Sequence, residues 1–330
     1  MTRKELNTQV KILGIGDAMV DLSTYASQLP PRGGNIWSTA VRLSPGGTTA
    51  NVAAGIARLG LNSCFIGCVG DDPYGHYTID EFKRIGVDTR HVQLRQGAFT
   101  GIVLAIIDET GERTFIACAR GASYTLLNEQ DFKEVDFKEY PIVHSTGVCF
   151  VEEPSRSVLL AILDKAHKAG SQVYFDPNLR LEGNRFPEEL RESQWKAFCF
   201  ADVVLIGDNE VDLMFPGKSL REAVDLMRTR GVQIVVVKQG DKGATIFSDE
   251  IEDSCPAFKV RVNSTTGAGD SFDAGFIAAR VRGASLSDSL VYACAVAGLK
   301  VTGSGARSVP EHSEVMEFLA ANGRKLKIDA

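Results

Sequence analysis

Short apolar runs alternate with longer amphipathic stretches along most of the chain. The short runs are rich in Val and Ile and end at turn residues, which predicts buried strands at Val10–Gly16, Ser63–Val69, Ile142–Ser145, Gln172–Phe175, Val203–Ile206 and Gln233–Lys238. The longer stretches predict helices near Thr49–Leu59, Tyr74–Arg84, Arg156–Ala169, Glu188–Phe198 and Leu220–Arg230. This alternation indicates an α/β protein with a mostly parallel sheet covered by helices on both faces.

Two regions depart from this rhythm. Asn35–Leu43 and Thr100–Ala117 alternate polar and apolar residues, which predicts exposed strands, and residues 108–111 predict a hairpin turn between two of them. We expect a small antiparallel β lid formed from about residues 33–45 and 98–120. After Lys259 the pattern is helical again, at Ala268–Arg282, Leu286–Val301 and Ser313–Ala321. With no repeat or low-complexity linker, residues 1–330 are expected to form one domain that carries this lid.

Composition narrows the class of protein. The 330 residues are 44% hydrophobic and 24% charged, with a formal net charge of −6, so the chain is not expected to be disordered or to bind nucleic acid or an anionic membrane. No apolar stretch approaches the roughly 18–20 residues of a membrane span, and the N-terminus lacks the apolar core of a signal peptide. The 7 cysteines form no Cys-x-x-Cys pair, which favours free thiols in a reducing cytoplasm.

The segment Asn263–Phe276 carries the strongest candidate chemistry. Gly267, Ala268 and Gly269 are small, and a predicted helix begins there. Unpaired N–H groups at a helix start, together with the helix dipole, form an anion site that suits a transferring phosphoryl group. Asp270 would stand beside it, able to accept a proton from an attacking hydroxyl. On these residues alone, an N-cap aspartate after a glycine turn explains the segment equally well.

Two segments nearer the N-terminus offer groups for a polar ligand. Gly46 and Gly47 permit close backbone approach, and Asn51 follows them in an apolar helical turn, where an unpartnered buried amide would cost about 1–3 kcal/mol. Asp17 and Asp21 follow the first predicted strand, at the sheet edge where α/β proteins bind ligands. A plain loop-to-helix start explains the glycines as often as a binding site does. The third glycine of a dinucleotide fingerprint is missing, since Met19 occupies its place, and a Walker phosphate loop is also missing.

Together, and in this order, these segments resemble the ribokinase-like, or PfkB, carbohydrate kinase family. The resemblance rests on Gly46, Gly47 and Asn51, on Ala57–Gly60 and Gly67–Gly75, and on Ser264–Asp270. Further family-like segments lie between them at Asp176–Arg180, Asn209–Asp212 and Lys238–Gly243. The resemblance spans about residues 10–310, and it implies a three-layer α/β sandwich with a mostly parallel central sheet and a small antiparallel lid.

The resemblance also implies an activity and a set of site residues. The activity is transfer of the γ-phosphoryl group of ATP to a primary hydroxyl of a sugar. Asp270 would be the general base, and the amides of Gly267, Ala268 and Gly269 would form the anion hole. The sugar would be held by Asp17, Asp21, Gly46, Gly47 and Asn51. Arg180 would clamp a phosphate or a substrate carboxylate, unless it is an ordinary solvated surface arginine.

The nucleotide and its ions are implied in the same way. Lys238, Gly240 and Gly243 would lie along the nucleotide, and Asn209 and Asp212 would organise Mg²⁺ through water. The family's magnesium element usually ends in glutamate where Asp212 stands. Ser264 occupies the place of an aspartate that helps ribokinases bind a monovalent cation, so activation by K⁺ is left open. The lid would exclude water from the site, and it forms a dimer contact in several relatives, so a homodimer is an expected partner arrangement.

The sugar is the least determined feature. Asp176–Arg180 and His144–Gly147 resemble the fructokinase and 2-keto-3-deoxygluconate kinase branch, so the preferred substrate is a ketose or a keto-sugar acid. For an acidic sugar, Arg180 or Arg120 is the candidate partner of the carboxylate. A ribose or nucleoside kinase of the same family and a non-catalytic sugar-binding relative remain the alternatives. An oxidoreductase would need the missing third glycine.

Overall fold

The computed structural model describes residues 9–110, 112–183 and 186–328. The strands are β1 (Lys11–Ile15), β2 (Met19–Tyr25), β3 (Ala40–Gly46), β4 (Asn62–Gly70), β5 (Asp88–Arg95), β6 (Gly101–Ile107), β7 (Arg113–Cys118), β8 (Ile142–Thr146), β9 (Gln172–Asp176), β10 (Val203–Gly207), β11 (Ile234–Lys238), β12 (Ala244–Phe247) and β13 (Glu252–Cys255). The helices are α2 (Thr48–Arg58), α3 (Pro73–Ile85), α4 (Ser155–Lys168), α5 (Glu188–Ala197), α6 (Asp208–Met214), α7 (Leu220–Arg228), α8 (Ala268–Val281), α9 (Leu286–Lys300) and α10 (His312–Ala321). Gly111 of the predicted hairpin turn lies outside the described residues.

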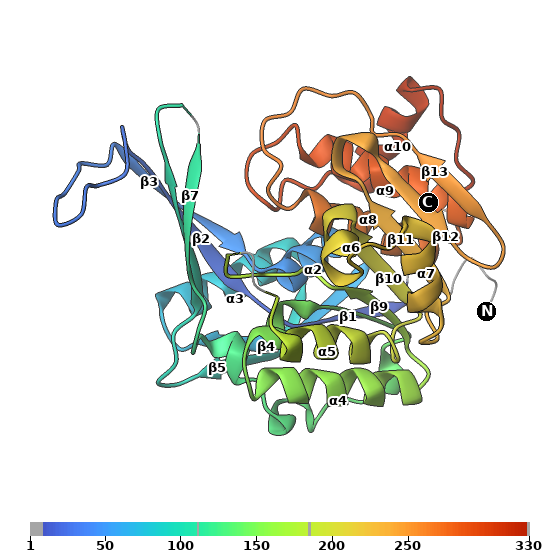
Figure 1. Cartoon of the computed structure of the whole chain (residues 1–330), viewed down its shortest axis with the longest axis horizontal. Helices are drawn as coiled ribbons and strands as arrows, with labels where there is room; N and C mark the ends of the chain where they lie inside the picture. The colour runs from blue at the N-terminus through green and yellow to red at the C-terminus, as the bar shows by residue number, and fades with distance from the viewer. Residues whose placement is uncertain (1–8, 111, 184–185, 329–330) are drawn as a thin grey trace.

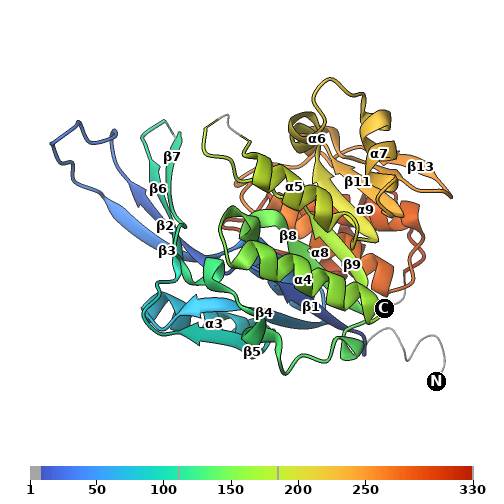
Figure 2. The same cartoon turned by 60° about the horizontal axis from the view of Figure 1, so that its bottom comes forward.

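A 9-stranded sheet forms the centre of the molecule (Figures 1 and 2), in the order β13-β12-β11-β10-β9-β8-β1-β4-β5. The strands from β11 to β5 pair in parallel, whereas β12 and β13 run antiparallel at one edge. The predicted α/β class with a mostly parallel central sheet is confirmed. Parallel strands end at the same edge of the sheet, so the polar residues that follow them are brought together there.

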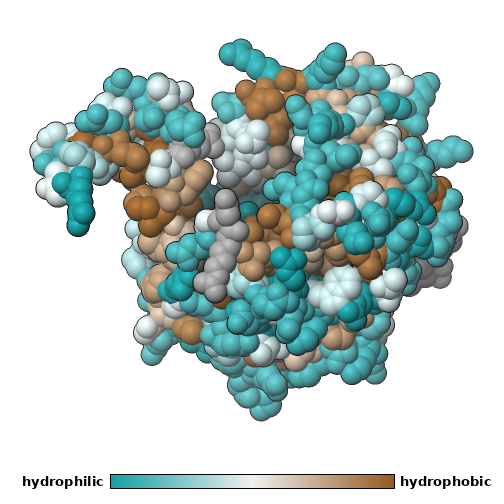
Figure 3. Space-filling model, in the orientation of Figure 1, coloured by the Kyte–Doolittle hydropathy of each residue, from teal (hydrophilic) through white to brown (hydrophobic). Residues whose placement is uncertain are grey.

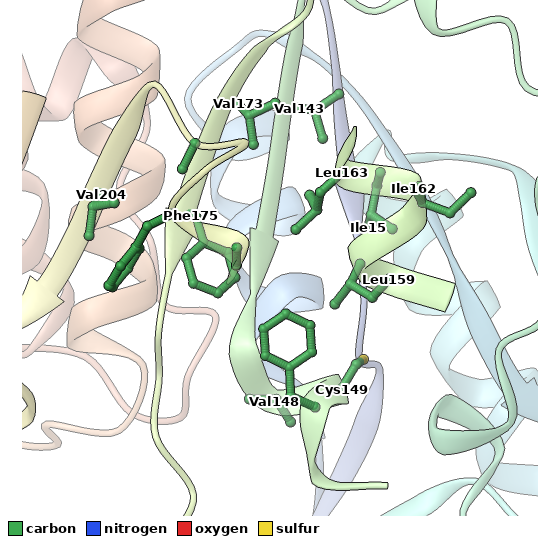
Figure 4. Packing of buried hydrophobic residues seen from close by; sticks show 14 of the residues in the cluster. Ile15, Val143, Val148, Cys149, Leu159, Ile162, Leu163, Val173, Phe175 and Val204 are labelled. Atoms are coloured by element: carbon green, nitrogen blue, oxygen red, sulfur yellow. The ribbon is translucent and has the colours of Figure 1, made fainter. Parts of the chain in front are cut away.

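Each face of this sheet packs against its own layer of helices. Along β10, Val204 and Ile206 face the core that includes α4, α5 and α7, while Val203 and Leu205 face the core that includes α2, α8, α9 and α10. Figure 4 shows part of the first core, where Ile15 of the sheet lies beside Leu159 and Leu163 of helix α4. Because both faces are buried, the strands read as continuous apolar runs rather than alternating ones.

A second sheet of 4 strands, in the order β3-β2-β6-β7, projects from the main body (Figures 1 and 2). We call it the projecting sheet. Its outer pairs, β2–β3 and β6–β7, are antiparallel, as expected for the small sheet. Its central pair, β2–β6, runs parallel instead. The sheet is built from two antiparallel pairs, β2–β3 and β6–β7, which lie side by side through β2 and β6. Between these pairs in sequence, the chain forms strands β4 and β5 of the main sheet.

The prediction of this sheet was incomplete in two respects. Strand β2 was not foreseen, because Met19–Tyr25 mixes polar and apolar residues and is mostly half-buried. The strand expected at Asn35–Leu43 begins only at Ala40 and continues to Gly46, paired with β2 along its length. This pairing brings Asp21 of β2 and Gly46 of β3, both predicted to bind the sugar, into one small sheet.

Other short elements also escaped prediction. Helix α6 spans Asp208–Met214, too short for a helical period to stand out, and it starts with a capping box in which Glu210 folds back onto the Gly207 N–H. Strands β5 and β13 lie at the two edges of the main sheet and carry polar residues, which weakens the apolar signal, and β12 is only 4 residues long. Within the described ranges, no helix is both long and apolar enough to cross a membrane.

Candidate active site

Helix α8 begins at the edge of the main sheet with a glycine turn. Gly267 is its N-cap with a φ of 77°, and a Cβ there would lie 2.7 Å from the carbonyl oxygen of Ala306. Only glycine adopts this conformation in this space without strain. Gly269 is exposed, and Gly267 and Ala268 are half-buried. The start of a 14-residue helix therefore lies at the surface, where the helix dipole favours an anion. Of the three predicted donors, the Ala268 N–H already donates to the carbonyl oxygen of Thr265 at 3.1 Å.

Asp270 lies in the first turn of α8, with only 7% of its surface exposed. Its Oδ2 accepts a hydrogen bond of 2.8 Å from Nδ2 of Asn51 on α2. Burial raises the pKa of Asp270 to about 6, and the Asn51 hydrogen bond and the Arg180 charge oppose that rise. At neutral pH the carboxylate is mostly ionised, and it can still take up a proton.

Arg307 was not foreseen from the sequence, yet it organises this part of the site. Its Nε donates to Oδ1 of Asn51 at 3.0 Å, and its Nη2 donates to the carbonyl oxygen of Gly46 at 3.1 Å. Its guanidinium lies 5.0 Å from the centre of the Phe82 ring. Arginine only donates, so Asn51 must turn its oxygen to Arg307 and its NH₂ to Asp270. Arg307 lies in a loop before α10 with no motif around it, so no sequence signal pointed to it.

Asn51 is engaged on both sides by these contacts. One of its two N–H groups binds Asp270 and one lone pair accepts from Arg307, so one donor and one acceptor position remain. Its exposed fraction is 6%. The predicted contact of Asn51 with a sugar thus has one N–H hydrogen and one oxygen lone pair to work with, and the amide is held in a fixed orientation.

The two aspartates after β1 occupy different environments. Asp17 has no exposed surface, and its carboxylate accepts hydrogen bonds from the backbone N–H groups of Thr48 and Thr49 at 2.7 and 3.1 Å. It also accepts from the Thr48 and Thr146 hydroxyls at 3.0 and 3.3 Å. We therefore correct the prediction for Asp17: in this structure it caps helix α2, and no surface is left for a sugar hydroxyl.

Asp21, by contrast, lies in β2 beside the glycine pair. Its pKa is raised to about 6 by burial, against the lowering effect of Arg307 and Arg180. A Cβ on Gly46 would come within 2.9 Å of its Oδ1, so that glycine leaves room for the carboxylate. Gly47 has a φ of 90°, and a Cβ there would lie 2.7 Å from Cα of Ala18. The structure brings Asp21, Gly46, Asn51 and Asp270 together around Arg307.

Lys238 ends strand β11 in a buried ion cluster. Its Nζ lies 2.8 Å from Asp176 and 3.0 Å from Asp273, and these carboxylates hold its pKa above the ordinary value despite burial. Burial also raises the pKa of Asp273 and lowers that of the adjacent His144 to about 4, which leaves the imidazole neutral. The ammonium lies 3.7 Å from where a Cβ on Gly269 would stand. Lys238 therefore places a positive charge close to the N-terminus of α8.

The loop after β9 carries Arg180, which is exposed. Its positive charge lowers the pKa of both Asp21 and Asp270, so it faces the same site. Glu210, another residue that sequence reasoning missed, anchors this loop by accepting from the Leu179 N–H at 2.6 Å. Arg120 instead forms a solvent-exposed ion pair with Glu182, at 2.6 Å. Arg180 is thus the better placed of the two arginines predicted for an acidic substrate.

The remaining predicted residues lie on α6 and in the turn that follows β11. Asn209 and Asp212 are both exposed on α6, and no group of three or more His, Cys, Asp or Glu side chains suited to a metal ion occurs in the described part of the chain. Gly240 is exposed. Gly243 has a φ of 104°, and a Cβ there would lie 1.9 Å from the carbonyl oxygen of Cys255, so it packs on β13.

Comparison with known proteins places these features in a family. The model of the pfkB family carbohydrate kinases matches residues 9–313. A fructokinase from Klebsiella pneumoniae is 31% identical over 314 residues, which cover 93% of this chain and 98% of that protein. A fructokinase from Xylella fastidiosa, solved with bound ATP, superposes with a TM-score of 0.85 at 25% identity, covering 95% of this chain and 99% of that one.

A third match adds a bound sugar. A double mutant of the fructokinase from Vibrio cholerae O395, solved with fructose, ADP and a potassium ion, superposes with a TM-score of 0.82 at 28% identity. The superposition covers 94% of this chain and 99% of that chain. All three comparisons extend over nearly the whole of both proteins, so they concern the entire fold and not a shared fragment.

Proposed function

Since the chain belongs to the pfkB family of carbohydrate kinases, we propose that it phosphorylates a ketose, with fructose preferred. As a member of this family it is an ATP-dependent sugar kinase, a phosphotransferase that acts on an alcohol group. The preference for fructose is supported by the names of its relatives from Klebsiella pneumoniae and Xylella fastidiosa. The observation that carries the proposal is the buried Asp270 carboxylate beside the glycine-lined start of α8.

In the proposed reaction, Asp270 accepts the proton of the sugar hydroxyl that attacks the γ-phosphorus of ATP. The hydroxyl oxygen forms a bond to phosphorus as the bond to the bridging oxygen of ADP breaks. The N–H groups of Gly267 and Gly269 stabilise the negative charge on the phosphoryl oxygens from the start of α8. The Ala268 N–H donates to the carbonyl oxygen of Thr265 at 3.1 Å, so it joins the anion hole only by sharing or leaving that bond. The hydrogen bond from Asn51 holds one carboxylate oxygen of Asp270, which leaves the other for the proton.

For the sugar we propose contacts with Asp21, Gly46, Gly47 and Asn51. Asp21 offers a half-buried carboxylate that carries no protein hydrogen bond among those found for the described residues, and carboxylates accept strongly from hydroxyl groups. Arg180 is proposed to contact a transferring phosphate or, with an acidic sugar, the substrate carboxylate. Its charge reaches both Asp21 and Asp270.

For the nucleotide we propose that ATP lies between the α8 N-terminus and the exposed loop at Gly240, and that Mg²⁺ accompanies it. Mg²⁺ keeps several waters and is usually bound by few protein carboxylates together with phosphate oxygens. The exposed carboxylate and amide of Asp212 and Asn209 fit that mode of binding through water. The ion would neutralise phosphate charge. Lys238 acts on the nucleotide only through its charge beneath Gly269, since its ammonium is paired with Asp176 and Asp273.

The projecting sheet is proposed to act as a lid and as the contact of a homodimer. Strand pairing places Val41, Leu43 and Ile116 on one face of this sheet, and they are 65%, 37% and 52% exposed. Asp21 alternates with Leu22 and so points to the opposite face. Figure 3 shows hydrophobic surface on this sheet and a hollow between it and the main body. An exposed apolar face of this kind marks an interaction surface.

We also propose that the protein works in a reducing compartment such as the cytoplasm. All 7 cysteines are free thiols, and 5 of them are buried. Disulfides form readily in oxidising compartments, so 7 unpaired thiols favour a reducing compartment.

The test of the proposed function is a kinase assay coupled to ADP release, run with fructose, 2-keto-3-deoxygluconate, tagatose, ribose and nucleosides. We expect the highest kcat/KM with fructose. Preference for the acidic sugar, lost selectively in Arg180→Met, would assign Arg180 to its carboxylate. Preference for ribose or a nucleoside would overturn the ketose assignment.

The variant Asp270→Asn tests the proposed base directly. We expect kcat to fall at least about 100-fold, while the affinity for fructose, measured by calorimetry, stays within about threefold. Turnover close to that of the unmodified enzyme would remove Asp270 from the mechanism. Absence of activity with every sugar in the unmodified enzyme, despite sugar binding, would indicate a non-catalytic relative.

A further inference from the structure

The last residue of helix α9 is a lysine with no exposed surface. Lys300 is 0% exposed, and its Nζ donates a hydrogen bond of 2.9 Å to the backbone carbonyl oxygen of Ser264. Burying an ammonium group is costly unless oxygen atoms replace its water, and lysine presents a compact point charge with three donors. A lysine in this position therefore has a specific task in the fold.

That carbonyl belongs to the loop that leads into helix α8. The N–H groups of Asn263 and Ser264 both donate to the carbonyl oxygen of Val301, at 2.7 and 3.1 Å. Further along, Gly267 packs against Ala306 so closely that a Cβ would not fit. The loop before α8 is thus docked on the segment that follows α9, and the Lys300 ammonium lies at the base of this contact. Its charge is fixed three residues before the helix N-cap, Gly267.

A potassium ion bound at this loop would need a different set of donors. Potassium is present in the Vibrio cholerae fructokinase structure, and Ser264 stands where the family resemblance places a cation-binding aspartate. Such ions are held by several carbonyl or carboxylate oxygens. Here the residue supplies a hydroxyl in place of a carboxylate, and its carbonyl already accepts from an ammonium. A second positive charge beside that ammonium would be repelled. The residues present do not fit potassium.

We propose that the Lys300 ammonium takes the place of a monovalent cation at the loop before helix α8, so that this kinase needs no potassium. The inference rests on the proposed function, because the start of α8 is there the phosphate site. A covalently attached cation is always present, holds the Ser264 carbonyl and adds positive charge behind the anion hole. The enzyme would then work equally well whatever the monovalent salt.

The direct test compares the unmodified enzyme in potassium, sodium and tetramethylammonium chloride at constant ionic strength. We expect kcat and the KM for ATP to agree within about twofold among the three salts. A rise in kcat of about tenfold or more on adding potassium, saturable and not reproduced by sodium, would overturn the proposal. This comparison needs no variant and so does not depend on any variant folding.

Two variants separate the charge of Lys300 from its hydrogen bond. Lys300→Gln keeps a donor for the Ser264 carbonyl and removes the charge, so we expect kcat to fall about tenfold in every salt. Lys259→Met is the matched control, since Lys259 is an exposed lysine just before the same loop, and it should keep full activity. If Lys300→Gln retained the kcat of the unmodified enzyme in all three salts, the charge would be unnecessary and the proposal wrong.

A binding measurement keeps this inference separate from the proposed function. ADP affinity is measured by calorimetry in potassium and in sodium, without any sugar. Equal affinities in the two salts are expected here, and tighter binding in potassium would contradict the role of Lys300. Failure of every sugar to be phosphorylated would refute the proposed function, whereas the ADP comparison would still decide whether potassium binds.

Discussion

At the scale of single residues, Asp270 meets two opposing demands. Its burial raises the pKa to about 6, because the carboxylate loses hydration. A general base must nevertheless be ionised at the working pH. The Asn51 hydrogen bond and the charges of Arg180 and Lys238 lower the pKa, while the negative charge of Asp176 raises it, and Arg307 also interacts with Asp270. The balance leaves a carboxylate that is charged at pH 7 and close to its proton-accepting range.

A pH dependence of kcat/KM follows from this balance. Because the deprotonated form of Asp270 is the active one, activity should fall as the pH drops through about 6. Asp21, whose pKa is also raised to about 6, loses its charge in the same range and steepens the fall. The measurement is a pH profile of kcat/KM for fructose between pH 5 and 8. A flat profile down to pH 5 would contradict the role of Asp270 as base.

Arg307 is the residue whose replacement tells most about how Asn51 is held. In Arg307→Met, Asn51 loses the donor that fixes its amide, and Asp270 loses a positive neighbour. We expect kcat to fall about tenfold and the acid limb of the pH profile to move up by about one pH unit.

The control for this variant is Arg58→Met. Arg58 also joins α2 to the segment before α10, through the Val309 carbonyl and Glu311, but it lies outside the site. Its removal should leave the pH profile in place. If Arg307→Met likewise left both kcat and the profile unchanged, its contacts with Asn51 and Gly46 would matter only for packing.

At the scale of elements, the N-terminus of α2 depends on a residue from another strand connection. The glycine before α2 offers no side-chain cap, so the carboxylate of Asp17 supplies the missing acceptors for two N–H groups and two hydroxyls. The same helix then presents Asn51 to Asp270. The contacts of Asp17 with the start of α2 thus also fix the position of Asn51, which donates to the proposed base Asp270.

Asp17→Ala should therefore lower stability. Removing the carboxylate leaves the buried N–H groups of Thr48 and Thr49 without their acceptor, at a cost of about 3 kcal/mol. Urea unfolding followed by circular dichroism measures this cost as a lower midpoint. An unchanged midpoint together with a raised KM for fructose would instead return Asp17 to the sugar site.

At the scale of the whole molecule, the projecting sheet exposes an apolar face, which we propose is covered by a second copy of the chain. A sheet of 4 strands with one apolar face exposed lacks a partner layer, whereas both faces of the main sheet are packed by helices. Covering that face by a second copy of the chain would remove Val41, Leu43 and Ile116 from water. The opposite face, which carries Asp21, would stay directed at the site.

The dimer can be tested with the double variant Val41→Glu, Ile116→Glu in analytical ultracentrifugation. We expect the unmodified protein to sediment as a dimer and the double variant as a monomer, because two charges per copy cannot be buried unpaired. Leu94→Glu, which changes an exposed leucine of β5 outside that sheet, should leave the dimer intact. Sedimentation of the unmodified protein as a monomer would end the dimer proposal.

Periodicity along the chain determined most of the architecture. Continuous apolar runs and helical spacing predicted the parallel sheet and nearly all long helices, because backbone geometry fixes the periods of 2.0 and 3.6 residues. Elements that are short or partly polar, such as β2 and α6, gave too weak a pattern. The glycine turn at Gly267 and the aspartate after it were also recognisable, since both are local features of one helix start.

Tertiary structure alone decided which side chains meet. Asn51 contacts Asp270 across 219 positions of sequence and Arg307 across 256, and Lys300 reaches Ser264 only because α9 packs beside the loop before α8. The same structure moved Asp17 from the expected sugar site to the start of α2. Local periodicity does not predict such pairs, because they depend on how whole elements pack against one another. That packing is determined only when the chain has folded.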